Sequence, residues 1–260
     1  MSGIRRRDFV ILLGGAAAWP LAARAQQPGK LPTIGFLGAN TRLVDSQRLA
    51  AFVERLRELG WIENRTVAIE YRWGEGRDER FAQIAAEFVR LKVDLIVTGA
   101  TPPTLAAKQA TSTIPIVFGA AGDPVATGLV ASLAKPGGNV TGLSGQSTDT
   151  AAKRLELLRA VVPNLRRLAI LTNIGNPTNV LERDEIRTTA HTVGLEAITM
   201  EIRRAEDIAP AFEALKGGAD ALYVCVDPLI FPNLVRINSL ALGARLPTMH
   251  GSREYVEAGG

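Results

Sequence analysis

The sequence is poor in the residues that most often bind metals or carry out covalent chemistry. Its 260 residues include one cysteine, Cys225, and two histidines, His191 and His250. A single cysteine excludes a disulfide within the chain. The two histidines have no partner at metal-ligand spacing, so we expect no metal site. Cys225 lies in the apolar run 221–226, which indicates a buried structural thiol.

Motifs for nucleotide binding and for nucleophilic catalysis are also missing. There is neither a G-x-G-x-x-G loop nor a Walker A loop, so we expect no cofactor. The segment 142–145 resembles a nucleophile elbow only superficially, because its spacing is wrong and Ser144 has no obvious histidine base. We therefore predict that the protein is not an enzyme; an enzyme would have to use Asp123, Asp227 or Ser144.

Excess positive charge and long apolar runs are lacking once the N-terminus is set aside. Residues 1–25 hold four of the 30 Lys and Arg residues and one of the 26 Asp and Glu residues. The rest of the chain therefore has a net charge of +1, which argues against a nucleic-acid partner. No later segment has the ~18 apolar residues of a membrane-spanning helix. Aromatic residues make up only 5% of the chain, so its core must consist mainly of Ala, Leu, Val and Ile.

The N-terminus has the three parts of a secretory signal. A positive start at Arg5–Arg7 precedes the apolar run 10–18, and Ala23–Ala25 fits a signal-peptidase site. Arg6–Phe9 also resembles a twin-arginine export motif, although arginine precedes it where that motif has Ser or Thr. The choice between the twin-arginine route and general secretion stays open. We predict a signal peptide over 1–25, cleavage near Ala25 and a soluble periplasmic product.

After the signal, strand patterns and helix patterns alternate along the chain. Continuous apolar strands are predicted over 33–37 and 221–226, and amphipathic helices over 44–59 and 78–91. Buried strands separated by amphipathic helices indicate an α/β fold, with parallel sheets that carry helices on both faces. The pattern further predicts a short helix over 124–133.

The Gly-rich stretch 135–145 divides the mature chain almost in half, and each half has its own succession of strands and helices. This arrangement predicts two Rossmann-like lobes, 26–138 and 139–260, with a hinge near Gly138. In doubly wound sheets, ligands bind beyond the carboxyl ends of the strands. Two such lobes facing each other would form a cleft from these loops.

Small and polar residues follow five of the predicted strands, where such a cleft would lie. Helix N-termini follow most of these loops, and their free N–H groups suit a small carboxylate or a similar anion. Asn, Asp, Thr and Gly are also ordinary residues of turns and helix caps, so each loop alone fits either interpretation. Their recurrence favours a ligand site. The loops are 38–41, 98–102, 119–124, 172–176 and 227–228.

One segment carries a family resemblance. The stretch 119–142, GAAGDPVATGLVASLAKPGGNVTG, is very similar to the signature of bacterial ABC transporter substrate-binding proteins of the tryptophan/tyrosine type, within the type I periplasmic-binding superfamily. The segments 52–60, 94–107 and 169–176 fit the same family, and the resemblance covers essentially all of 30–260. It implies the two-lobed type I periplasmic-binding fold, a hinge, and capture of an amino acid or a related small molecule for delivery to an ABC permease in the inner membrane.

The resemblance also implies where the ligand binds. Asp123 and Asp227 would receive an amino group, and the loop amides would receive a carboxylate. We expect a monomer that binds neither cofactor nor nucleic acid. The implied contact residues are Asn40, Gly99, Ala100, Thr101, Ala121, Asp123, Asn173, Asn176 and Asp227.

The chain departs from the family pattern at its C-terminus. Family members usually run considerably further, and their tails add hinge crossings and complete the first lobe, whereas this chain ends at Glu257–Gly260. We therefore expect an unpaired sheet edge or uncovered apolar surface in the first lobe. Two alternatives to transport stay open: a periplasmic sensory or regulatory module with the same lobes, and a truncated remnant that binds nothing.

Overall fold

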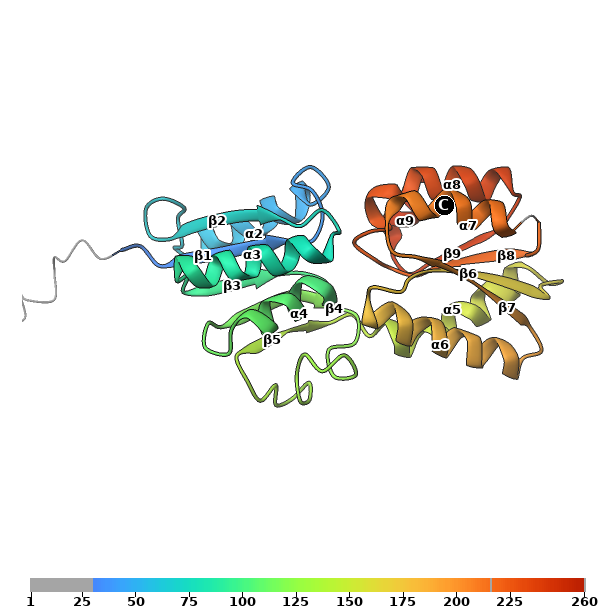
Figure 1. The fold of residues 1–260 in the computed structure, drawn as a ribbon, viewed down its shortest axis with the longest axis horizontal. Coiled ribbons are helices and arrows are strands. Elements are labelled where there is room, and N and C mark those ends of the chain that lie inside the picture. Colours follow the sequence, from blue (N-terminus) through green and yellow to red (C-terminus); the bar gives the residue numbers. More distant parts are fainter. Residues whose placement is uncertain (1–29, 216, 260) are drawn as a thin grey trace, which may run out of the picture. The chain divides into compact units, whose positions relative to one another are not determined.

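The computed structural model describes residues 30–215 and 217–259. The predicted signal peptide and its cleavage site at Ala25 lie outside these residues. From Pro32 onward, the described chain forms one compact unit that contains two separate parallel sheets (Figure 1). No helix among the described residues combines the length and the apolar character that crossing a membrane requires.

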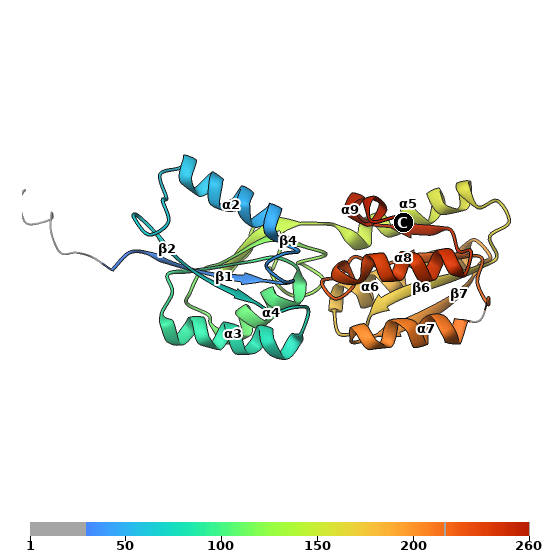
Figure 2. The ribbon, with the colours of Figure 1, turned by 90° about the horizontal axis from the view of Figure 1, so that it is seen from above.

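The first sheet and its helices come from the first half of the described chain. Their bounds are β1 (Thr33–Gly38), α2 (Ser46–Glu58), β2 (Ala68–Trp73), α3 (Asp78–Leu91), β3 (Leu95–Thr98), α4 (Thr101–Ala110), β4 (Ile116–Ala121) and β5 (Val140–Ser144). The strands pair in parallel in the order β2-β1-β3-β4-β5. Helices α3 and α4 cover one face, and α2 lies on the other (Figure 2). Phe81 and Phe88 of α3 are part of the buried core on the α3 side.

The second sheet is built from the rest of the chain. Its elements are α5 (Ser147–Val161), β6 (Arg167–Asn173), α6 (Pro177–Thr192), β7 (Glu196–Ile202), α7 (Ile208–Leu215), β8 (Ala221–Val224), α8 (Leu234–Gly243), β9 (Thr248–His250) and α9 (Arg253–Glu257), with short 3-10 turns at Ala205–Asp207 and Phe231–Asn233. The parallel order is β7-β6-β8-β9. One buried cluster lies under α5 and α6 and another under α7 and α8. The predicted α/β fold with two parallel sheets, each flanked by helices, is therefore confirmed.

The boundary between the two halves differs from the predicted one. Strand β5 pairs with β4, so it belongs to the first sheet. The chain therefore passes to the second sheet at Gly145–Gln146, after β5, and not near Gly138. Gly142 lies inside β5, where only glycine fits, because a Cβ there would be 2.1 Å from the carbonyl oxygen of Phe118. The high glycine content of 135–145 thus reflects close packing of a strand as well as a loop.

The prediction of a helix over 124–133 is wrong. This segment consists of turns and bends. The Asp123 side chain accepts a hydrogen bond from the backbone N–H of Ala126 at 3.0 Å. Gly128 has a φ of +71°, and the N–H of Val130 donates to the carbonyl of Pro124 at 3.0 Å. A left-handed residue at this point reverses the chain and prevents a helix from continuing.

Part of the first sheet is open to solvent. Each residue of α2 is at least partly exposed. On the strands β4 and β5, Val117 is 36% exposed and Leu143 is 70% exposed. These two side chains are uncovered apolar residues of the first sheet, and the cause that the sequence suggested for such surface stays a prediction.

Candidate functional site

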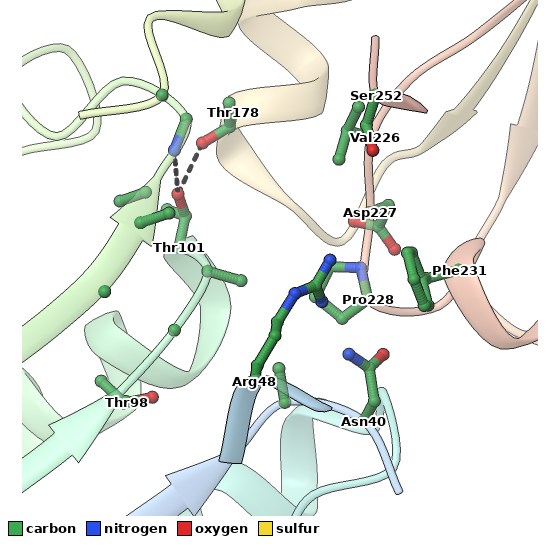
Figure 3. A pocket seen from close by; sticks show the side chains of 18 of the residues that line it. Asn40, Arg48, Thr98, Thr101, Thr178, Val226, Asp227, Pro228, Phe231 and Ser252 are labelled. Carbon is green, nitrogen blue, oxygen red and sulfur yellow. Dashed lines mark hydrogen bonds between the residues drawn. The ribbon is translucent and has the colours of Figure 1, made fainter. Parts of the chain in front are cut away.

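A cavity of about 610 Å³ lies at the carboxyl ends of the strands and has walls from both halves of the chain. The first half contributes the loops after β1, β3 and β4. The second half contributes the first turns of α5 and α6, the loops after β8 and β9, and α9. Figure 3 shows these walls facing each other, with Asn40 and Thr101 on one side and Asp227 and Phe231 on the other. The volume is in the range typical of sites for small molecules.

Most of the expected contact residues lie in this wall. Asn40 and the segment Gly99–Thr101 come from the first half of the chain together with Ala121, and Asn176 and Asp227 come from the second. These residues are far apart in sequence, and parallel pairing brings their strand ends to one edge of each sheet. Their role as ligand contacts stays a prediction.

Asp123 and Asn173 are not part of the cavity wall. Asp123 uses its carboxylate to stabilise the turn that follows it, as described above. Asn173 is 6% exposed; its Nδ2 donates to Asp227 at 3.0 Å, and its Oδ1 accepts from the N–H of Gly175 at 2.9 Å. Neither side chain is placed to meet a ligand in this conformation, so their assignment as contacts finds no support in the geometry.

Asp227 lies in the wall, but its carboxylate is already fully engaged. Each oxygen accepts two hydrogen bonds, which uses the roughly four acceptor positions of a carboxylate. Burial raises the pKa of Asp227, and the amide donors oppose that rise. This carboxylate organises the wall around it and offers no free oxygen to an amino group. The donors are Asn173 Nδ2 and the Leu229 N–H on Oδ1, and Asn176 Nδ2 and Asn179 Nδ2 on Oδ2.

The two halves of the chain touch directly beside the cavity. The hydroxyl groups of Thr101, at the start of α4, and Thr178, at the start of α6, are 2.8 Å apart (Figure 3). The N–H of Gly122 also donates to Thr101 Oγ1, at 3.3 Å. A Cβ at Gly122 would be 2.0 Å from Thr178 Cγ2. The absence of a side chain at Gly122 therefore permits this close approach.

The loop before α4 contains a strained residue. Ala100 has φ 68° and ψ 163°, a conformation that is nearly restricted to glycine. Its N–H donates to the carbonyl of Ala120 at 2.6 Å, which ties the loop after β3 to the strand β4. Strained backbone of this kind is concentrated at binding sites and active sites, and here it lies in the cavity wall.

The charged residues of the wall were not expected from the sequence. Asp45, Arg48 and Arg154 all line the cavity. Arg48, on α2, lies 3.0 Å from Glu254 of α9 and 5.0 Å above the ring centre of Phe231, so it bridges the two halves (Figure 3). In the sequence, these charges are indistinguishable from the solvated faces of amphipathic helices.

Arg154 belongs to a buried network behind the wall. Glu182 has a fully buried side chain, and burial raises its pKa while Arg154 lowers it. Burial also raises the pKa of Tyr223. The Arg154 guanidinium donates to Glu182 Oε1 and Ser147 O, both at 2.6 Å, to Thr150 Oγ1 at 2.7 Å, and to the Tyr223 hydroxyl. These hydrogen bonds fix α5 to the second sheet.

Aromatic rings and a neutral histidine complete the surroundings. Phe36, Phe52, Phe231 and Tyr255 line the cavity, and Phe36 packs against Phe52 with ring centres 5.7 Å apart. Burial lowers the pKa of His250 to about 4, so its ring, 5.5 Å from that of Tyr255, is uncharged near neutral pH. Within the described residues, no group of three or more His, Cys, Asp or Glu could hold a metal ion. The arrangement is suited to holding a small molecule with both apolar and polar parts.

Comparison with known proteins identifies related sequences. A family model described as ABC transporter substrate binding protein matches residues 45–260. A protein named Tyrosine-binding protein, from Clostridioides difficile (strain R20291), is 31% identical over 209 residues, which cover 80% of this chain and 60% of that protein. The chain thus spans about 60% of the length of this curated relative.

Two solved structures share the fold over most of the chain. A conserved domain protein from Vibrio cholerae O1 biovar El Tor superposes with a TM-score of 0.82 at 27% identity, covering 89% of this chain and 77% of its own. An ABC domain in complex with L-Trp, from Streptococcus pneumonia, superposes with a TM-score of 0.79 at 26% identity and the same coverage, 89% and 77%.

Proposed function

Because the chain belongs to the ABC transporter substrate binding protein family, we propose that it is the solute-binding component of an ABC importer. It holds a small molecule, an amino acid or a similar solute, in the cavity between its two sheets. The observation that carries this proposal is the cavity itself, whose walls come from the strand ends of both halves of the chain. A site divided in this way is completed only when the halves approach each other, which couples binding to closure.

The chemistry of the wall supports an amino acid with an apolar side chain. Aromatic rings from both halves of the chain border the cavity, and aromatic surfaces stack well on a planar apolar group. Two of the similar proteins are named for tyrosine binding or were solved with L-Trp. L-tyrosine and L-tryptophan are therefore the first compounds to test.

The cellular setting follows from the N-terminal signal and from the family. The protein acts in the periplasm after export directed by residues 1–25, as a monomer that delivers its solute to a permease in the inner membrane. The signal sequence and the membership of the family support this part of the proposal. The protein works by binding and release, without a chemical step.

A thermal-shift screen tests the proposal. The protein is heated with each of the twenty L-amino acids and with sugars and aromatic acids as other solute classes. A ligand at one hundred times its Kd stabilises the folded state by about 2.7 kcal/mol, which raises Tm by roughly 5–10 °C for a protein of this size. If no compound in any class raises Tm, the proposal is wrong.

The variant Gly99→Leu tests whether a ligand found in the screen binds in this cavity. Gly99 lines the cavity, and an ideal Cβ there meets no heavy atom of the described chain within 4 Å. A leucine side chain at this position should therefore extend into the cavity, leave the Tm of the ligand-free protein close to its original value, and abolish the shift caused by any ligand. A shift of unchanged size in Gly99→Leu would place the ligand elsewhere.

A further inference from the structure

The side-chain amide of Asn40 has only one possible orientation. Its Nδ2 lies 2.9 Å from Asp45 Oδ1, and its backbone N–H lies 3.3 Å from Asp45 Oδ2. An ionised carboxylate accepts hydrogen bonds and donates none, so the amide nitrogen must face Asp45. The carbonyl oxygen of Asn40 is thereby fixed on the other side of the amide.

This carbonyl oxygen is buried, and among the described residues nothing donates to it. Asn40 is 6% exposed and belongs to the cavity wall. In Figure 3 its side chain points from the first half of the chain towards the segment that carries Asp227 and Pro228. A buried acceptor without a partner is costly, so a ligand that supplies an N–H or O–H donor here removes that cost on binding.

The charges around Asn40 favour a cationic donor. Arg48 lies 3.7 Å from Asp45 and 3.0 Å from Glu254. These three side chains together carry one net negative charge, and two of them, Asp45 and Arg48, line the cavity. Asp45 also polarises the Asn40 amide through its nitrogen, which makes the carbonyl oxygen a stronger acceptor. An ammonium group therefore fits this position better than a neutral hydroxyl group.

The other acidic residues of the region are less suitable partners for an ammonium group. The carboxylate of Asp227 already accepts four hydrogen bonds, and Asp123 is outside the wall. Resting on the proposed function, we infer that Asn40 Oδ1 accepts a hydrogen bond from the ammonium group of an α-amino-acid ligand and that Asp45 holds the amide in place. This side chain therefore selects amino acids over acids of the same shape that lack the amino group.

Pairs of ligands that differ only in the ammonium group test this inference. Isothermal titration calorimetry compares L-tyrosine with 3-(4-hydroxyphenyl)propionate and L-tryptophan with indole-3-propionate. Any other L-amino acid found in the screen is compared with its des-amino acid. We expect the original protein to bind the amino acid at least about 10-fold more tightly, as a charge-assisted hydrogen bond implies.

Three variants sharpen the experiment. Asn40→Ala should weaken amino-acid binding about 10- to 100-fold and change des-amino binding by less than about threefold. Asp45→Asn frees the Asn40 amide to turn. Like Asn40→Ala, it should reduce the preference for the amino acid over its des-amino analogue. Asn164→Ala, at an exposed loop position, should leave both affinities unchanged. If Asn40→Ala fails to fold, the pair of ligands on the unaltered protein still decides.

The possible outcomes separate this inference from the proposed function. Equal affinity for both members of a pair, or an equal loss for both in Asn40→Ala, would overturn the role of Asn40 and leave solute binding intact. Binding of acids or sugars alone, without any amino acid, would do the same. Binding of no compound would overturn both proposals.

Discussion

At the scale of single residues, the cavity wall contains two kinds of polar side chain. Asp227 and Asn176 of the wall satisfy one another by hydrogen bonds, together with Asn173 outside it, so they define the shape of the wall. Asn40 keeps one buried acceptor without a partner in the described chain. In the sequence, all four are polar residues that follow a predicted strand. Only the count of hydrogen bonds distinguishes a residue that supports the wall from one that is ready for a ligand.

The Asp227 network leads to a prediction about stability. Asp227→Asn turns one of its two acceptor oxygens into an NH₂ group that faces amide donors. The free energy of unfolding should fall by about 3 kcal/mol, because buried donors lose their acceptor. Urea denaturation measures this change. Asp123→Asn is the control: it keeps one oxygen for the Ala126 N–H and should cost less than about 1 kcal/mol. Similar losses in both variants would contradict the buried network.

At the scale of elements, the geometry of the site depends on short loops between strands and helices. The loop after β3 approaches strand β4 closely, as the hydrogen bond between Ala100 and Ala120 shows. The start of α6 approaches the same region through Thr178, where its hydroxyl group meets that of Thr101. These contacts require small residues, and Gly122 is the tightest case.

Gly122→Ala should therefore act as a wedge between α6 and the first sheet. Its Cβ would be 2.0 Å from Thr178 Cγ2, so the halves cannot close fully. Overpacking of this kind costs about 1–3 kcal/mol, and if the closed state alone bears this cost, ligand affinity should fall about 10-fold or more. Calorimetry with the ligand from the screen measures the loss.

A second substitution checks the cause. Adding Thr178→Ser removes Cγ2 and should restore most of the affinity lost in Gly122→Ala. Gly243→Ala, at the end of α8 where a Cβ meets no heavy atom of the described chain within 4 Å, should have no effect. A loss that Thr178→Ser does not reverse would show that the closed contact is not the reason.

At the scale of the whole described unit, one connection, Gly145–Gln146, joins the two sheets. Gln146 has a φ of 46°, so this connection includes a left-handed residue. Other contacts between the halves are non-covalent, including the Arg48–Glu254 ion pair and the stacking of Arg48 on Phe231. In the closure proposed above, opening would break these contacts, so they would favour the closed arrangement.

Arg48→Ala should increase the open population of the ligand-free protein. The ion pair is exposed and the stacking is partly exposed, so each contributes up to about 1 kcal/mol. The ratio of closed to open molecules should fall about 3- to 10-fold. Single-molecule fluorescence transfer measures this ratio with dyes on cysteines introduced at Leu59 and Val161, which are 59% and 77% exposed. The native Cys225 is buried and should not react.

Two further variants divide the contribution of Arg48. Glu254→Gln should remove the part of the effect of Arg48 on the closed-to-open ratio that depends on salt concentration. Phe231→Leu should remove the part that does not depend on salt. Arg159→Ala, at an exposed position of α5, serves as the control. A ratio unchanged in Arg48→Ala would show that these contacts do not hold the halves together.

The sequence by itself determined the class of fold and the strand ends where the cavity lies. Apolar runs and amphipathic periods are local, so β1, α3 and the parallel α/β arrangement could be predicted, and seven of the nine expected contact residues lie in the wall. The tertiary structure decided what depends on distant partners. It placed β5 in the first sheet, replaced a predicted helix after Pro124 by turns, and brought Arg48 and Arg154 to the cavity. Burial and hydrogen bonding depend on residues far along the chain, and local composition does not contain that information.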